Sequence, residues 1–434
     1  MKRTSKGLPA IYLAVLGLAP LQAQAVRIDY TVAAGVERND NVLMTADDPA
    51  TSTAARAGLG FMVSEDTSTV QANFGGRFEY WNYFEGPQSN AFETSLAGRL
   101  NWFIVPETFS FTVEDSLEMR PIDRFAADVP DNRQRVNVLS LGPNVHFNFS
   151  QAFRGRFELR WIDSSAQETD ELESQRVSAA LHAIRNLDPT SSLTFSVRAQ
   201  DVDFEHELVA TDYRRYDAYM RYQKELARLG FGVDLGYSQA DFRDGRSSNY
   251  PMVRGNVHWR TGDRNSLTLT LAHQLSDTAT DAIEGIGLTT EVPEGLIGTS
   301  STVNASIYEE DRAELAYAYE GERLGFSLGP YYERIRYLDA LALDETRRGV
   351  LLQTSYRLAP TWNLLAFADV SRSTFPDLDR RTEDRHAGLS IDKTWSRHWS
   401  SALQYSRYER NGDLFSAGDS RQNLWYLSVI YRNR

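Results

Sequence analysis

Arginine and acidic side chains share one face of several extended segments, and this is the arrangement in the chain best suited to chemistry. In the segment 153–161, Arg154, Arg156, Glu158 and Arg160 occupy alternate positions. Because side chains on a strand alternate between its two faces, these four groups point the same way. Arginine stays charged and presents a planar fork to carboxylates or phosphates, so such a face could bind an anionic solute.

The same reasoning, applied segment by segment, predicts a set of polar side chains that line one common space. The alternative is that opposite charges pair along the inside of any wet wall. A register shift of one residue would also invert a whole segment. The residues expected to line a solute path are Arg77, Arg99, Arg154, Arg156, Glu158, Arg160, Arg198, Arg215, Asp217, Arg221, Arg254, His258, Arg260 and Arg357, with Glu79, Glu93 and Glu314 beside them.

Catalytic and metal-binding chemistry has no recognisable motif here. The chain has seven histidines, but it has no H-x-x-x-H pair and no G-x-S-x-G motif. It has no cysteine, which excludes a disulfide scaffold and a thiolate metal site. Glycine-rich phosphate loops are absent, and Asp413 and Asp419 lack the spacing of an EF-hand loop. We therefore expect no enzyme activity, no cofactor and no metal.

The elements that must position the charged face are strands. In the segment 153–161 the intervening residues are Phe153, Phe157, Leu159 and Trp161, so one face is apolar and the other charged. About twenty segments of this alternating kind follow one another, with no helical periodicity of useful length. No helix is expected after residue 25.

The first 25 residues have the form of a secretory signal peptide. Lys2, Arg3 and Lys6 precede an apolar stretch over 8–21, and Ala23-Gln24-Ala25 has the small-x-small form of a cleavage site. The alternative is an N-terminal membrane anchor. We predict cleavage before Val26, leaving one domain over 26–434. Loss of the three positive residues takes the formal charge from −13 to −16, which disfavours nucleic-acid binding.

The connections between the segments alternate between short turn-like sequences and longer polar ones. Bacterial outer-membrane barrels have short periplasmic turns and longer external loops, and a closed ring leaves no unpaired backbone in lipid. The predicted fold is therefore all-β, a transmembrane antiparallel up-and-down β-barrel of about 18–20 strands. An even number of strands places both termini in the periplasm, and the predicted location is the outer membrane.

Aromatic residues gather near the ends of the predicted strands, as expected of the belts that sit at lipid headgroups. One group is Tyr80, Trp81, Tyr83 and Phe84, and the other is Trp102, Trp362, Trp395 and Trp399. The long connection 276–310 contains several glycines. It either folds into the lumen and constricts it or forms an external loop.

The start of the predicted mature chain resembles a family of outer-membrane β-barrel proteins associated with bacterial exopolysaccharide-synthesis or exosortase systems. The similarity rests on Gly35-Val36-Glu37-Arg38-Asn39-Asp40-Asn41-Val42, a strand that runs into a (D/N)-D-N-(V/I) loop, and it covers the first 80 residues best. It implies a role in exopolysaccharide secretion or display. Two features depart from related barrels: the last aromatic, Tyr431, lies three residues before the end, and no periplasmic helical-repeat domain precedes the barrel.

The leading functional hypothesis is a channel that takes part in exopolysaccharide export through an arginine-rich lumen. The alternatives are a porin for small solutes and a structural or adhesive surface barrel with a plugged lumen. The expected partners are outer-membrane lipids and lipopolysaccharide, the barrel-insertion machinery, an anionic polysaccharide and periplasmic export components.

Overall fold

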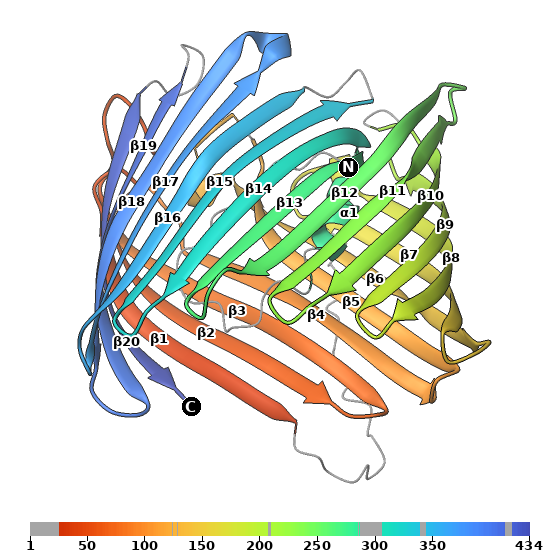
Figure 1. Ribbon diagram of the computed structural model, residues 1–434. Helices are drawn as coiled ribbons and strands as arrows, with labels where there is room; N and C mark the ends of the chain where they lie inside the picture. Colours follow the sequence, from red (N-terminus) through yellow and green to blue (C-terminus); the bar gives the residue numbers. More distant parts are fainter. Residues whose placement is uncertain are drawn as a thin grey trace.

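The computed structural model describes residues 26–123, 125–127, 129–206, 210–284, 286, 306–338, 344–412 and 419–434. The predicted signal peptide lies outside this range. Twenty strands follow one another in the described part of the chain (Figure 1). They are β1 (Arg27–Asn39), β2 (Ser52–Asp66), β3 (Val70–Glu85), β4 (Ala91–Val105), β5 (Phe109–Pro121), β6 (Arg133–Asn148), β7 (Phe153–Ala166), β8 (Ser174–Asp188), β9 (Ser191–Phe204), β10 (Tyr213–Glu225), β11 (Leu229–Phe242), β12 (Ser247–Arg260), β13 (Asn265–Ser276), β14 (Tyr308–Glu320), β15 (Leu324–Tyr337), β16 (Glu345–Ala359), β17 (Trp362–Phe375), β18 (Arg380–Thr394), β19 (Trp399–Gly412) and β20 (Ser420–Arg432).

The strands form one closed antiparallel sheet, so the predicted up-and-down barrel is confirmed. Each strand pairs with its neighbours in the sequence, and β1 pairs with β20 from Thr31–Arg432 to Asn39–Leu424. The connections at one end span two to four residues, whereas those at the other end span four to 31. The predicted alternation of short turns and longer loops is therefore present, and the architecture fits an outer-membrane β-barrel.

The motif Gly35 to Val42 lies at the seam that closes the ring. Asp40 Oδ1 accepts a hydrogen bond of 2.6 Å from the backbone N–H of Asn423, and Asn41 Nδ2 donates one of 2.9 Å to the carbonyl oxygen of Arg421. Asn41 and Val42 are both buried. These contacts tie the end of β1 to the start of β20, which gives the motif a structural role in closing the barrel.

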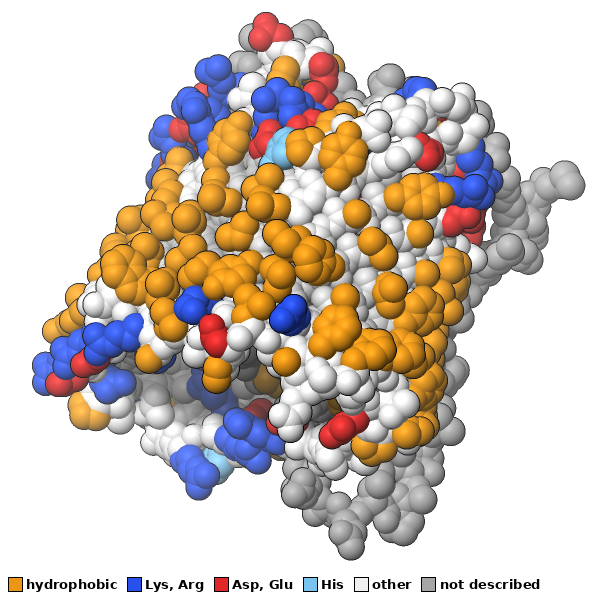
Figure 2. All heavy atoms as spheres, turned by 45° about the vertical axis from the view of Figure 1, so that its right-hand side comes forward, with side chains coloured by type: hydrophobic (Ala, Val, Ile, Leu, Met, Phe, Trp, Pro, Cys, Tyr) orange, Lys and Arg blue, Asp and Glu red, His pale blue; other side chains and the backbone are white. Residues whose placement is uncertain are grey.

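The outer wall carries the apolar face of the strands. In β7, Phe153, Phe157, Leu159 and Trp161 are each more than a third exposed, as the alternation predicted. Figure 2 shows the result for one side of the molecule: hydrophobic side chains form a broad band, and charged side chains gather toward its two margins. Such a surface is stable against lipid tails and unfavourable in water.

Two sequence-based predictions are wrong. Trp81 is 7% exposed and Tyr83 is partly buried, so neither belongs to an outer aromatic belt. The reason is alternation: Tyr80 faces outward at 45% exposure, so the odd-numbered neighbours turn inward. The second wrong prediction is that the chain has no helix after residue 25. A short α-helix, α1 (Thr278–Glu284), follows β13, and short 3-10 turns occur at Pro130–Asn132, Asp170–Leu172 and Pro376–Leu378.

In the described residues, no helix is long and apolar enough to span a membrane.

Adjacent residues of β19 allow a direct test of which face is outside. Leu403 is 41% exposed on the outer wall, whereas Ala402 lines the lumen opposite Asp392. We expect Leu403→Arg to destabilise the barrel in phospholipid vesicles, lowering its free energy of unfolding by about 2–4 kcal/mol, because it places a charge against lipid tails. Ala402→Arg should cost much less, since its charge stays in the wet lumen. Urea titrations measure both variants, and equal losses would contradict the assignment of faces.

Candidate functional site

A large cavity of about 1620 Å³ lies inside the ring. Residues of β1–β3, β5, β10–β20 and α1 line it, and none of the described lining residues belongs to β4 or β6–β9. The cavity therefore follows one side of the barrel. A smaller cavity of about 590 Å³ lies at the end with the short turns, where Arg99 contributes to its wall.

Charged side chains pair across neighbouring strands of this cavity wall. Asp234 on β11 accepts a hydrogen bond of 2.6 Å from Arg221 Nε on β10, and Arg254 Nη2 on β12 lies 2.8 Å from its other oxygen. The Asp234 side chain is almost fully buried, and all three side chains belong to the cavity wall. Asp234 therefore holds two arginines in fixed positions at the cavity.

The side chains of a second charged group, around Arg56 on β2, are almost fully buried. Arg56 Nη1 donates a hydrogen bond of 2.6 Å to Glu37, and the guanidinium also pairs with Glu79. The guanidinium carbon lies 3.9 Å from the ring centroid of Trp81 and 4.4 Å from that of Tyr426. Buried cations held in this way fix the orientation of their neighbours. This group therefore orders the wall near the β1–β20 seam.

The side of the lumen without the cavity is occupied by α1. Figure 1 shows α1 inside the ring. Its Ala279 and Ala282 pack in an apolar cluster with Val138 of β6, and Ile162 of β7 packs against this cluster. Because α1 follows β13 and contacts β5 and β6, it spans the lumen between distant strands. Of the two predictions for 276–310, insertion into the lumen therefore holds for α1. Residues 285 and 287–305 of this connection lie outside the described part of the chain.

A fully buried ion pair anchors the start of α1. Asp277, just before the helix, pairs with Arg176 on β8. The Asp277 carboxylate also accepts hydrogen bonds of 3.1 Å from the backbone N–H of Ala279 and of Thr280, which satisfies free donors of the first turn. Burial alone would raise the pKa of Asp277, but the charge of Arg176 and these hydrogen bonds lower it, so Asp277 stays ionised.

The other polar contact of α1 involves Asp281. It accepts hydrogen bonds from the hydroxyl of Ser276, at 2.5 Å, and from the hydroxyl of Tyr308 on β14. Burial, together with the neighbouring charges of Glu310 and Asp277, raises the pKa of Asp281 to about 7. The charge of Asp281 in turn acts on Glu333 of β15. One proton near Asp281 therefore relieves repulsion among buried carboxylates.

An apolar cluster fills the space above α1, at the end with the longer loops. It contains Tyr213, Phe204 and Phe242 from neighbouring strands, together with Leu275 and Ile307 from the two ends of the α1 connection. Tyr213 packs against both phenylalanine rings, at centroid distances of 6.2 and 5.9 Å. A packed core inside the ring holds the connection in the lumen, because its withdrawal would expose this surface to water.

A second connection also crosses this end of the barrel. The β5–β6 connection carries Phe125, whose ring packs edge-on against Phe375 at the end of β17, 4.9 Å between centroids. Arg380 of β18 lies 4.7 Å above the Phe125 ring, and Arg410 Nη2 of β19 donates a hydrogen bond of 3.1 Å to the Phe125 carbonyl oxygen. The described parts of these two connections narrow the mouth from different sides.

The predicted lumen residues all occupy the inward-facing positions of their strands, but they differ in their surroundings. Arg215 and Asp217 form a buried pair, and Glu158 pairs with Arg156 and Arg160. His258 contacts Thr268, and Arg260 donates to the Ala227 carbonyl near the short turns. Arg77, Arg221 and Arg254 line the large cavity. Those outside the lining of the large cavity are Arg99, Arg154, Arg156, Glu158, Arg160, Arg198, Arg215, Asp217, His258, Arg260 and Arg357.

Several lining residues were missed by the sequence analysis. They include Arg120, Arg312 and Arg347, with the tyrosines Tyr308 and Tyr331. Arg347 gave no signal of alternation, since its neighbours Thr346 and Arg348 are both polar. For Arg120 a signal was present, because it lies between the apolar Met119 and Pro121. Arg176 could have been placed inward in the same way, but its partner Asp277 lies in a connection and has no strand alternation.

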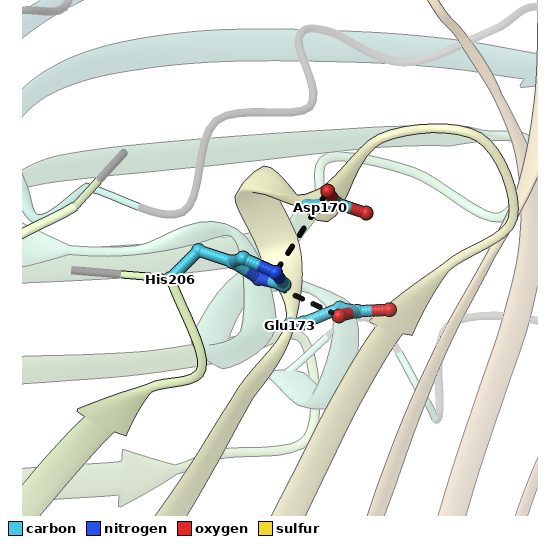
Figure 3. A group of neighbouring side chains, drawn as sticks. All are labelled: Asp170, Glu173 and His206. Atoms are coloured by element: carbon cyan, nitrogen blue, oxygen red, sulfur yellow. Dashed lines mark ion pairs between the residues drawn. The ribbon is translucent and has the colours of Figure 1, made fainter. Parts of the chain in front are cut away.

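Among the residues that the structure describes, two groups of side chains have a spacing that could hold a cation. In one, near the loop end, His206 lies between Asp170 and Glu173, 3.9 and 3.7 Å from their carboxylate oxygens (Figure 3). These side chains are largely exposed. In the other, His273 lies beside Glu309 and Asp311, but Arg336 already pairs with both carboxylates. The charge of Arg336 opposes a metal ion at the second group.

Comparison with known proteins gives no family for the chain. No family model and no curated protein matches it. Among solved structures, it resembles the copper transporter OprC, with 11% identity, a TM-score of 0.48 and coverage of 95% of this chain and 81% of that chain. It also resembles the siderophore receptor PirA from Pseudomonas aeruginosa, with 11% identity, a TM-score of 0.46 and coverage of 94% and 81%. We take neither a solute nor a mechanism from these likenesses.

Removing the charge of Asp277 should release α1 from the lumen. The Asp277→Asn change leaves Arg176 buried without a countercharge, which costs about 3–5 kcal/mol. Since the chain has no cysteine, the buried Ala282→Cys can report on α1. We expect maleimide to label it at least about tenfold faster in the Asp277→Asn background. Asp263→Cys, in an exposed turn, is the control and should react equally in both backgrounds. Unchanged protection of residue 282 would contradict the anchoring role.

The insertion of α1 should also weaken as pH rises toward about 7. The folded pKa of Asp281 lies above its ordinary value, so this group stabilises insertion fully at low pH and loses that effect as it ionises. We expect labelling of Ala282→Cys, relative to Asp263→Cys, to increase from about pH 5 to about pH 7 and to level off above that pH. Asp281→Asn removes the titrating group and should flatten this profile. A flat profile in the protein with Asp281 intact would contradict the assignment.

Proposed function

We propose that the protein is a channel of the bacterial outer membrane that passes a polar solute through its charged lumen. The observation that carries this proposal is the pairing of an apolar outer band with a large polar cavity inside one closed wall. A wall of this kind is suited to separate lipid from a water-filled path. The twenty strands place both termini at the end with the short turns, which we assign to the periplasm.

The finer proposal is that the solute is an exopolysaccharide on its way out of the cell. Arginines and tyrosines line the cavity together, among them Arg254, Arg347 and Tyr331. Guanidinium groups can bind the carboxylates or phosphates of an acidic polysaccharide, while aromatic rings offer flat apolar surfaces to sugar rings. The resemblance of the segment 35–42 to barrels of exopolysaccharide systems supports the same solute.

A porin for small solutes is the second candidate, and the position of α1 favours it. A polymer would have to displace α1 and the connection that carries Phe125, whereas a small solute could use the cavity beside them. If both connections stay in place, the third possibility is a surface barrel with a plugged lumen. These functions differ in what crosses a membrane that contains the purified protein alone.

Ion selectivity tests the charged path directly. In planar bilayers under a salt gradient, we expect Arg221 and Arg254 to favour the passage of anions, because both guanidinium groups belong to the cavity wall. The double variant Arg221→Gln/Arg254→Gln should move the reversal potential toward cation preference. Arg264→Gln, in an exposed turn, is the matched control and should leave the potential unchanged. An unaltered potential in the double variant would show that ions do not pass this wall.

Two further measurements separate the candidates. Deletion of the gene should lower the amount of secreted exopolysaccharide if export is the function, and unchanged secretion would remove that proposal. Liposome swelling in the presence of small sugars identifies a porin. A purified barrel that neither conducts nor swells liposomes, even with Asp277→Asn, would be a plugged surface protein.

A further inference from the structure

Seven arginines form a row on the outside of the barrel, just above its apolar band. They lie on β1 and on β15–β20, which are neighbours around the ring (Figure 1). All occupy outward-facing positions in the halves of these strands nearest the longer loops. Their spacing shows this: Arg38 lies two residues beyond the exposed Val36, Arg348 two before Val350, and Arg372 two beyond Val370. We call this row the arginine belt; its members are Arg38, Arg334, Arg348, Arg372, Arg385, Arg407 and Arg421.

The register of the strands brings like charges together within the belt. Arg348 of β16 and Arg372 of β17 are direct cross-strand partners. Like charges placed opposite each other on one face are destabilising unless an anion lies between them. Arg372 also pairs with Glu383, which in turn is shared with Arg385. The arrangement at this point therefore has more positive charge than its protein neighbours neutralise.

The acidic residues along the belt are too few to balance it. Among the described residues of these seven strands, Glu383 and Glu409 are the acidic side chains on the same outer margin. Glu409 is bound to Arg407, as Glu383 is to Arg372 and Arg385. On the neighbouring β14, Asp311 is the cross-strand partner of Arg334. Seven arginines against these three acidic side chains leave an excess of positive charge on the outside of the wall, and this attracts anions at the height of the membrane surface.

The opposite side of the barrel has a different composition at the same height. There the outward-facing residues include Asp163 of β7, Asp201 and Asp203 of β9, and Asp241 of β11. The nearby Arg214 pairs with Asp201, so this margin holds no comparable positive excess in the described residues. The belt is thus a property of one half of the barrel.

The position of the belt identifies the kind of anion. Immediately beneath it, the outer wall exposes Val36, Val350, Val370, Trp425 and Leu427. A ligand that uses both surfaces must carry phosphates at the boundary and acyl chains along the wall. A solute in the lumen cannot reach these groups, and free phosphate makes no use of the apolar wall. Arginine forks suit phosphate groups in particular.

We propose that the arginine belt is a binding site for the phosphate groups of lipopolysaccharide, along one half of the outer margin of the barrel. This inference rests on the proposed outer-membrane location, with the longer loops at the cell surface. The lipid phosphates occupy the space between Arg348 and Arg372 and relieve the repulsion there.

The test compares two double variants of the full mature chain, refolded in detergent. Arg348→Gln/Arg372→Gln removes the central pair of the belt. Arg135→Gln/Arg214→Gln removes two exposed arginines from the opposite margin and is the matched control. Binding of lipopolysaccharide, of the same lipopolysaccharide after removal of its phosphates, and of phosphatidylglycerol is measured by native mass spectrometry. A heat-modifiable shift on gels confirms that each variant is folded.

We expect the belt variant to bind lipopolysaccharide at least about tenfold more weakly, because it loses charge-assisted hydrogen bonds to the phosphates, while the control variant binds normally. Removal of the phosphates should weaken binding to the unaltered protein equally. Equal binding by both variants would overturn the proposal. If the unaltered protein binds phosphatidylglycerol as tightly as lipopolysaccharide, and the belt variant loses both, the assignment of the belt to lipopolysaccharide is wrong. If the barrel is folded and conducts ions but binds neither lipid, the result contradicts the arginine-belt proposal alone. If the chain does not insert into bilayers, the result contradicts the proposed function.

Discussion

The need to pair every backbone N–H and C=O group in an apolar surrounding determines this structure. A strand surrounded by lipid has no water to satisfy its edge, so the sheet must close on itself. Here closure depends on the pairing of β1 with β20 and on the contacts that Asp40 and Asn41 make across that seam. The segment from Gly35 to Val42 thus has a structural role in closing the ring.

A ring of twenty strands is wide enough to need further structure inside it. The chain solves this unevenly. On one side, α1, the Arg176–Asp277 pair and an apolar cluster around Tyr213 form a small core within the lumen. On the other side, paired arginines and carboxylates surround a cavity. The division explains why arginines of similar appearance in the sequence have different roles, since some hold the inserted connection and others face the path.

The charges on the two surfaces of the wall also serve different purposes. Inside, Arg221 and Arg254 are balanced in part by Asp234, which keeps them ordered at the cavity. Outside, Arg348 and Arg372 face each other at the margin of the apolar band. In the proposed function, the first arrangement acts on the solute in the lumen, and the second binds the lipid that surrounds the barrel. Both arise from the same residue type because alternation sends neighbouring side chains to opposite faces.

The sequence by itself determined the strands, their approximate number and the face on which each side chain lies. These follow from a period of two residues, which is local and can be read from segments such as 153–161. The prediction that four aromatic residues between Tyr80 and Phe84 all face the lipid ignored this alternation, and it was wrong for Trp81 and Tyr83. Only the tertiary structure decided which charges meet and what fills the lumen. Arg176 and Asp277 are 101 positions apart, and Phe125 and Arg410 are 285 apart, so no local pattern specifies either contact. Their pairing depends on the curvature of the closed ring, which brings connections together across its mouth.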